Sequence, residues 1–184
     1  TNSKKNAEKI QMLRNHGISR TLKHRYSHGK PWDYDIIEPG YNYRLDEIRS
    51  ALGINQLKRI QKLNKLRETA SKYYNSKLKN INGIQVPIET KESQNSYHLY
   101  IIRINEKFKI SRDVLFEKLL KEKIITSVHY KPLHEFTAYK NSKKKDNLEN
   151  SKKIYKQILS LPMYPYITKK EQDMVIKCIN DISE

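Results

Sequence analysis

The chain has 184 residues, of which 36% are hydrophobic and 31% are charged, with only five glycines and six prolines. This length fits one domain or one domain and a part, and the composition favours an ordered, helix-rich protein over a disordered one. The net charge of +17 suits a polyanionic partner such as nucleic acid, anionic lipid or a phosphorylated small molecule. Because the lysines are spread along the chain and interleaved with 20 acidic residues, we favour ordinary charged surfaces instead.

The chain contains a single cysteine, Cys178, so no disulfide can form within it. We find no signal peptide and no apolar run of membrane length. These features together predict a cytoplasmic protein without a membrane partner.

The first 40 residues predict one helix and one long irregular segment. Asn2 or Ser3 can cap a helix from about Lys4 to His16, and Gly17 is a typical stop. Residues 18–40 carry two prolines, two glycines and the only tryptophan, so we expect a loop. A loop of that length in a compact domain usually has a function.

A long helix is expected next, from Leu45 to Leu78. Uninterrupted, it would be about 50 Å long, which is enough to connect two domains. Its apolar residues recur at helical spacing. They include Leu45, Ile48, Ala51, Leu52, Leu57, Ile60, Leu63 and Leu66.

In the second half of the chain, short strand patterns alternate with helix patterns. Such alternation predicts an α/β fold, here a small sheet with helices on one face. The predicted strands are 83–88, 96–104 and 125–130. The predicted helices are 112–121 (capped by Ser111), 151–159 and one from Thr168 to about Ile179. We expect residues 131–148 to form a polar loop.

The first candidate site is the sequence Gly40 to Arg44, directly before the long helix. Tyr41, Asn42 and Arg44 supply phenol, amide and guanidinium donors there. Donors at a helix N-terminus are typical of a phosphate or carboxylate site. The spacing alone leaves a second interpretation open, in which Asn42 simply ends the turn and caps the helix.

The second candidate site is "VHYKPLH", residues 128–134. His129, Tyr130 and His134 follow a predicted strand, near the sheet edge at which ligands bind in α/β folds. The alternative is that these side chains only satisfy a turn. His24 and His28 are four residues apart, but the residues between and after them do not favour a helix, so we expect no metal site.

Five segments together carry a resemblance to a known family. In this order and at these intervals, they resemble the C-terminal half of the DegT/DnrJ/StrS nucleotide-sugar aminotransferases, from Ala7 to Ile179. The segments are "AEKIQMLRNHG", "EPGYNYRLDEIRSALGINQLKRI", "SYHLYIIRI", "VHYKPLH" and "LSLPMYPYITKKEQDMVI".

The resemblance implies a fold-type-I enzyme that uses pyridoxal 5′-phosphate (PLP). Such enzymes move an amino group from glutamate or glutamine onto a nucleotide-linked keto sugar, with PLP held as a Schiff base on a lysine. That catalytic lysine is expected upstream of Thr1, so the chain alone should be inactive. Residues 1–56 would end the large domain, 57–82 would form the connecting helix and 83–184 the small C-terminal domain.

The resemblance also assigns roles to both candidate sites. In a homodimer, Asn42 would reach the PLP phosphate of the neighbouring subunit, and Tyr41 and Arg44 would support the loop or contact that phosphate. His129, Tyr130 and His134 would line the sugar-nucleotide side of the cleft. We keep one alternative, a basic module that binds nucleic acid or another anion and has no enzymatic activity; under the aminotransferase interpretation, no nucleic acid is bound.

Overall fold

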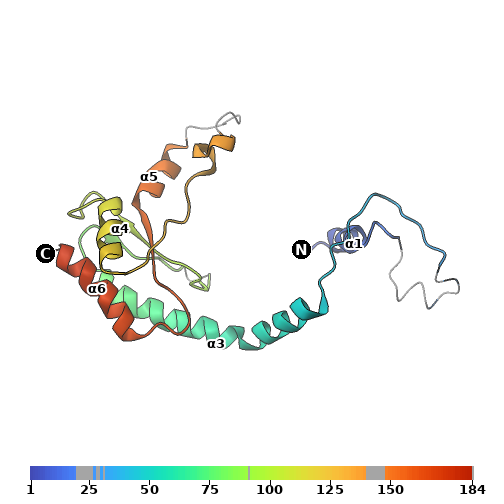
Figure 1. The fold of residues 1–184 in the computed structure, drawn as a ribbon, viewed down its shortest axis with the longest axis horizontal. Helices are drawn as coiled ribbons and strands as arrows, with labels where there is room; N and C mark the ends of the chain where they lie inside the picture. Colours follow the sequence, from blue (N-terminus) through green and yellow to red (C-terminus); the bar gives the residue numbers. More distant parts are fainter. Residues whose placement is uncertain (20–26, 28–29, 31, 91, 140–147, 184) are drawn as a thin grey trace. The chain divides into compact units, whose positions relative to one another are not determined.

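The computed structural model describes residues 1–19, 27, 30, 32–90, 92–139 and 148–183 (Figure 1). The chain divides into two compact units, Thr1–Lys58 and Arg59–Glu184. Helix α3 (Glu47–Leu78) begins in the first unit and ends in the second. The two units are described separately below.

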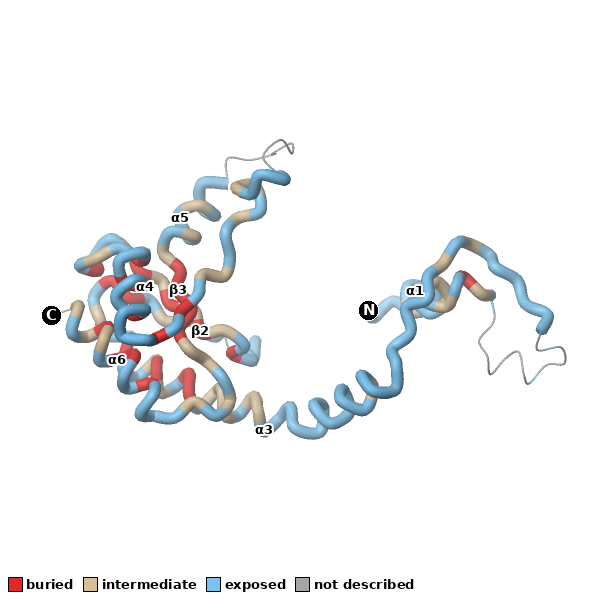
Figure 2. Tube along the Cα trace, viewed as in Figure 1, coloured by how far each residue is buried: buried red, intermediate tan, exposed pale blue. Residues whose placement is uncertain are grey.

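The first unit contains helix α1 (Lys4–Leu13), which begins where the sequence predicted and ends three residues earlier. Ser3 is the N-cap, because its hydroxyl accepts a hydrogen bond from the amide of Asn6. Gly17 is the only buried residue among those described in this unit (Figure 2). The described residues of this unit therefore form no hydrophobic core.

The part of α3 that lies in the first unit carries exposed apolar side chains on two faces. Successive residues of a helix are rotated by about 100°, so Ile48 and Leu52 lie on one face, and Ile54 and Leu57 lie on roughly the opposite face. All four are exposed, and Ile48 is 84% exposed. A helix with apolar residues on two faces normally packs against other protein on both, so this part of α3 requires packing that the described residues do not provide.

The second unit is built on a three-stranded antiparallel sheet in the order β1-β2-β3. Its strands are β1 (Ile84–Gln85), β2 (Tyr100–Ile104) and β3 (Ile158–Leu161). Residue 104 pairs with residue 84 on one side of β2, and residues 100 to 103 pair with residues 161 to 158 on the other.

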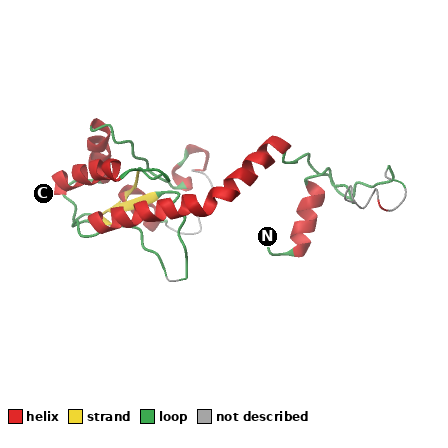
Figure 3. Ribbon diagram, turned by 90° about the horizontal axis from the view of Figure 1, so that it is seen from below, coloured by secondary structure: helices red, strands yellow, loops and turns green. Residues whose placement is uncertain are grey.

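Helices cover one face of this sheet, as the sequence predicted. Alternate residues of β2 are buried and pack against α3, α4 (Arg112–Lys121) and α6 (Lys169–Ser183). Figure 3 shows the strands beside α3. The buried residues of this core are Tyr74, Leu78, Ile84, Tyr97, Tyr100, Ile102, Ile104, Phe108, Leu115, Leu119, Ile124, Leu159, Leu161, Val175, Ile176 and Ile179.

Two predicted helix caps in this unit are confirmed. The Ser111 hydroxyl accepts a hydrogen bond from the amide of Val114 at the start of α4. Before α6, Thr168 and Glu171 form a reciprocal capping box: the Glu171 carboxylate accepts from the amide and hydroxyl of Thr168, whose hydroxyl accepts from the Glu171 amide.

Three predictions for the second unit are wrong. Helix α5 (Glu149–Gln157) ends two residues before the predicted end, and the residues after it form β3. Residues 125–130 do not form a strand but make a single bridge, Ser127 to Ser160. The described part of the predicted loop 131–148 contains two short 3-10 helices, η1 (Leu133–Glu135) and η2 (Thr137–Tyr139), and residues 140–147 lie outside the described residues.

The first two errors have one physical origin. A short apolar run such as 158–161 fits a buried strand or the end of a helix equally well, and periodicity does not separate them. All four residues of β3 are buried and pair with β2, so this run forms the third strand of the sheet and residues 125–130 do not. Within the described part of the chain, no helix is both long and apolar enough to cross a membrane.

Candidate functional site

Residues 40–44 lie along the C-terminal end of α1 and are held there by backbone hydrogen bonds. The amide of Tyr41 donates to the carbonyl of Leu13 (2.7 Å), and the amide of Tyr43 donates to that of Arg14 (2.9 Å). The carbonyl of Tyr41 accepts from the amide of His16 (2.9 Å). Asn42 therefore sits in the middle of an anchored segment.

Two glycines allow this close approach. A Cβ atom at Gly40 would lie 2.2 Å from the backbone nitrogen of Gly17, and one at Gly17 would lie 1.8 Å from the carbonyl oxygen of Glu38. Gly17 also has a φ of +74°, a backbone angle that residues other than glycine rarely adopt. The segment can thus contact α1 only because both positions lack a side chain.

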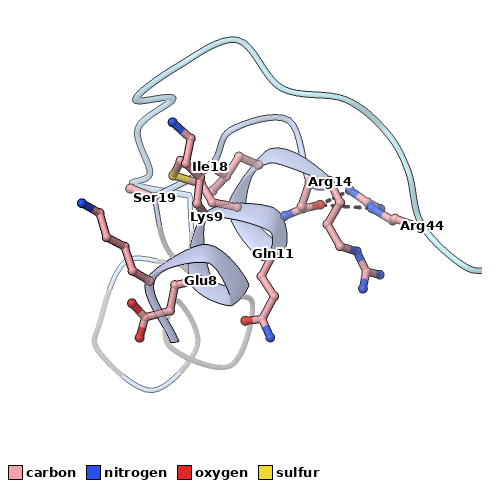
Figure 4. Close-up of a pocket in the computed structure, with 10 residues that line it drawn as sticks. Glu8, Lys9, Gln11, Arg14, Ile18, Ser19 and Arg44 are labelled. Atoms are coloured by element: carbon pink, nitrogen blue, oxygen red, sulfur yellow. Dashed lines mark hydrogen bonds between the residues drawn. The ribbon is translucent and has the colours of Figure 1, made fainter. Parts of the chain in front are cut away.

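Arg44 fastens the end of the segment to α1. Its Nε and Nη2 atoms both donate to the side-chain oxygen of Asn15, at 3.1 and 2.6 Å, and Figure 4 shows these bonds as dashed lines. In the described part of the chain, no carboxylate forms an ion pair with Arg44. Its positive charge remains available to an anion.

The side chain of Asn42 is exposed and, within the described residues, makes no hydrogen bond. On either side of it, the rings of Tyr41 and Tyr43 stack on each other with centroids 4.9 Å apart and planes 10° apart. The backbone bonds and this stacking hold the backbone at Asn42 in place. The side-chain amide of Asn42 has no partner among the described residues.

The helix-capping interpretation of Asn42 is wrong. Helix α3 begins at Glu47, and its cap is Asp46, whose Oδ1 accepts from the amide of Arg49 at 2.8 Å. Asn42 precedes that cap by four residues, so it does not satisfy the α3 amides. The expectation that the donors lie directly at the helix start is also wrong, because Tyr41, Asn42 and Arg44 all precede the cap Asp46.

A surface hollow of about 750 Å³ runs along α1 beside Arg44 (Figure 4). Its charged lining comprises Lys5, Lys9, Arg14 and Arg44 against one acid, Glu8. This excess of positive charge suits an anionic neighbour. A phosphate dianion suits the Arg44 guanidinium and the net positive lining of this hollow. The amide of Asn42, two residues before Arg44, is a further donor but does not line the hollow.

The three residues predicted at the second site have different surroundings in the structure. Tyr130 is 72% exposed, although its ring meets the His129 ring edge to face, with centroids 4.7 Å apart. His134 lies in η1, and its Nε2 is buried without a hydrogen-bond partner among the described residues. The pKa of Glu149, the first residue of α5, is lowered mainly by the Lys152 ammonium and to a small extent by His134.

His129 lines a smaller hollow of about 170 Å³, here called the His129 hollow. It lies between the start of β2, residues 125–129 and the end of β3. The residues that line it are His98, Leu99, Ile125, Thr126, Ser127, His129, Ser160, Leu161, Pro162 and Met163. Neither Tyr130 nor His134 belongs to this lining, so the three predicted residues do not form one site by direct contact.

Sequence reasoning missed several residues that these sites depend on. Asn15 holds Arg44, Asp46 caps α3, and Ser160 bonds His129. Asp46 could have been found, because aspartate is a preferred N-cap. Ser160 could not, because its strand was read as the end of a helix. No cluster of three His, Cys, Asp or Glu residues occurs in the described ranges, and His24 and His28 lie outside them.

The fold of the chain defines a class of protein: it matches part of the fold-type-I aminotransferases, whose solved structures it covers to about half of their length. The chain belongs to the DegT/DnrJ/EryC1/StrS aminotransferase family, whose model matches residues 1–180. This confirms the resemblance found in the sequence.

Named relatives agree with this membership. The chain is 37% identical to the UDP-4-amino-4,6-dideoxy-N-acetyl-beta-L-altrosamine transaminase of Campylobacter jejuni, over 100% of the chain and 47% of that protein. It is 33% identical to the spore coat polysaccharide biosynthesis protein SpsC of Bacillus subtilis, over 99% of the chain and 48% of that protein. A solved structure also matches, that of PseC from Helicobacter pylori, an aminotransferase involved in the biosynthesis of pseudoaminic acid. Its TM-score is 0.84 at 26% identity, over 99% of this chain and 47% of PseC. The chain thus spans about half the length of the relatives it matches.

Proposed function

We propose that this chain acts as the second half of a PLP-dependent aminotransferase that moves an amino group from glutamate or glutamine onto a nucleotide-linked keto sugar. When bound, PLP supplies the electron sink for the transfer, and a lysine outside this chain holds it. The product would be an amino sugar for a surface polysaccharide, another glycan or a secondary metabolite. The family match argues against the alternative of a basic binding module without enzymatic ancestry.

The observation that carries this proposal is the anchored loop with a free amide at Asn42. A catalytic site gains most from groups that are already held in place before the ligand binds. We assign the Asn42 amide as donor to the PLP phosphate of the neighbouring subunit, with Arg44 as the adjacent positive charge. Tyr41 supports the loop by stacking on Tyr43.

The exposed apolar residues of α3 support a homodimer of longer subunits. Ile48, Leu52 and Leu57 would be buried partly by the large domain and partly by the second subunit. In such a dimer, residues 1–56 would belong to the large domain and 83–184 to the small one. We assign His129, Tyr130 and His134 to the side of the cleft that holds the sugar nucleotide.

The test compares the 184-residue chain with full-length subunits that contain it. Full-length subunits loaded with PLP should change the cofactor absorbance when glutamate or glutamine is added, and an acceptor keto sugar should reverse the change. The chain alone should give neither response. Borohydride treatment of the chain with PLP should also leave no stoichiometric adduct on one lysine; such an adduct would refute the assignment of the cofactor lysine to another segment.

A further inference from the structure

The His129 hollow holds a histidine whose ring is fixed by a residue from another element. The Nδ1 atom of His129 lies 2.8 Å from the hydroxyl oxygen of Ser160, in the middle of β3. Ser160 is itself only 5% exposed. Its backbone is paired with Ile101 of β2 on one side and exchanges two hydrogen bonds with Ser127 on the other. The hydroxyl therefore occupies a defined position against the ring.

The proton on this hydrogen bond can be assigned by counting donors. A serine hydroxyl has one hydrogen to donate, and a neutral imidazole has one nitrogen that donates and one that accepts. Among the described residues, Ser160 Oγ has no other partner that could accept its hydrogen. If Nδ1 carried the proton, the buried Ser160 hydrogen would be left without an acceptor, which is costly. The serine thus donates to Nδ1, and the ring proton sits on Nε2.

We propose that Ser160 is a positioning residue that holds His129 with its proton on Nε2, so that this nitrogen donates a hydrogen bond to an oxygen atom of the sugar. The choice of a sugar as ligand rests on the proposed function. The tautomer itself does not depend on that function, because it follows from the contact with Ser160.

A second feature of the hollow agrees with a polar ligand. Thr126 is 7% exposed, and its hydroxyl is buried without a hydrogen-bond partner among the described residues. Buried hydroxyls normally have partners, because an unpaired one loses its bonds to water. Thr126 lines the same hollow as His129 and can both donate and accept. A ligand oxygen in the hollow would meet the Nε2 donor of His129, and Thr126 offers a second polar group in the same lining.

The tautomer can be measured on the 184-residue chain by nitrogen-15 NMR of the imidazole rings. In the wild type, His129 should show its proton on Nε2 and an Nδ1 shift typical of a hydrogen-bond acceptor. Ser160→Ala should lose that shift and show a fraction of the form protonated on Nδ1. Ser160→Thr, which keeps the hydroxyl, should restore the wild-type pattern, and the control Ser127→Ala should not alter it.

Two results would overturn the positioning role: a proton on Nδ1 in the wild type, or an unchanged His129 signal in a folded Ser160→Ala chain. Titration of full-length subunits that contain this chain with UDP-N-acetylglucosamine tests the ligand. The Nε2 signal should move with this probe and not with UDP, and less in Thr126→Val. Binding that leaves Nε2 unmoved would overturn the sugar contact alone. Absence of binding would count against both the sugar contact and the proposed function, while the tautomer still decides the role of Ser160.

Discussion

Asp46 and Asn42 have separable roles that can be tested by replacing each with alanine. Asp46→Ala removes the Oδ1 that accepts from the Arg49 amide at 2.8 Å, and with it the ion pair from Oδ2 to Arg49 at 3.2 Å. Loss of an N-cap costs about 1 kcal/mol. The ion pair adds little, because the Arg49 side chain is 75% exposed and the Asp46 side chain 48% exposed. Asn42→Ala removes no hydrogen bond within the described residues and should change stability by less than about 0.5 kcal/mol.

Amide hydrogen exchange in the first turns of α3 measures this difference. One kcal/mol corresponds to about a fivefold change in an equilibrium constant, so residues 50–52 should exchange about five times faster in Asp46→Ala. Their exchange should stay within about twofold of the wild type in Asn42→Ala. Faster exchange in Asn42→Ala than in Asp46→Ala would return Asn42 to the role of a cap and remove the argument that its amide is free for a ligand.

Three further predictions concern the fold. Gly40→Ala should release the loop from α1, because the new Cβ would lie 2.2 Å from a facing backbone nitrogen, and the slow exchange of the Tyr41 amide should be lost. Leu119→Ala, in the core, should lower the free energy of unfolding by about 2–5 kcal/mol. Val114 is 40% exposed in the same helix, so Val114→Ala should lower it far less. Equal losses of the two variants in urea unfolding would contradict the assigned core. The Thr168 amide and hydroxyl hold the pKa of Glu171 below its ordinary range. The stabilising effect of the Glu171 carboxylate should therefore be complete above that range and fade as the pH falls through the lowered pKa. Glu171→Gln should weaken this loss of stability at acid pH in urea unfolding, and an unchanged pH profile would contradict it.

Much of the fold could be predicted from the sequence where local chemistry decides the structure. Ser3, Ser111 and Thr168 cap their helices as predicted, because a cap depends only on residues within one turn. The core strand β2 was predicted too, although it begins four residues later than expected. Strand β3 was missed, because only its partner across the sheet distinguishes it from the end of α5.

The candidate sites were predicted less completely, because side chains distant in sequence complete them. The resemblance singled out Asn42 and His129, but the contact of Arg44 with Asn15 spans 29 positions and that of His129 with Ser160 spans 31. No local pattern reports such pairs. The helical spacing of the apolar α3 residues likewise does not tell how many sides of the helix are covered.

The central claim is that Asn42 completes the PLP phosphate site of a neighbouring subunit, and subunit mixing tests it most directly. A hydrogen bond to a charged phosphate contributes about 1.5–3 kcal/mol, so Asn42→Ala in full-length subunits should lower PLP affinity about ten- to a hundredfold. Mixing these subunits with subunits that lack the cofactor lysine should restore part of the activity, because one site of each mixed dimer then combines an intact lysine with an intact Asn42. No recovery of activity in dimers shown to exchange subunits would contradict the claim.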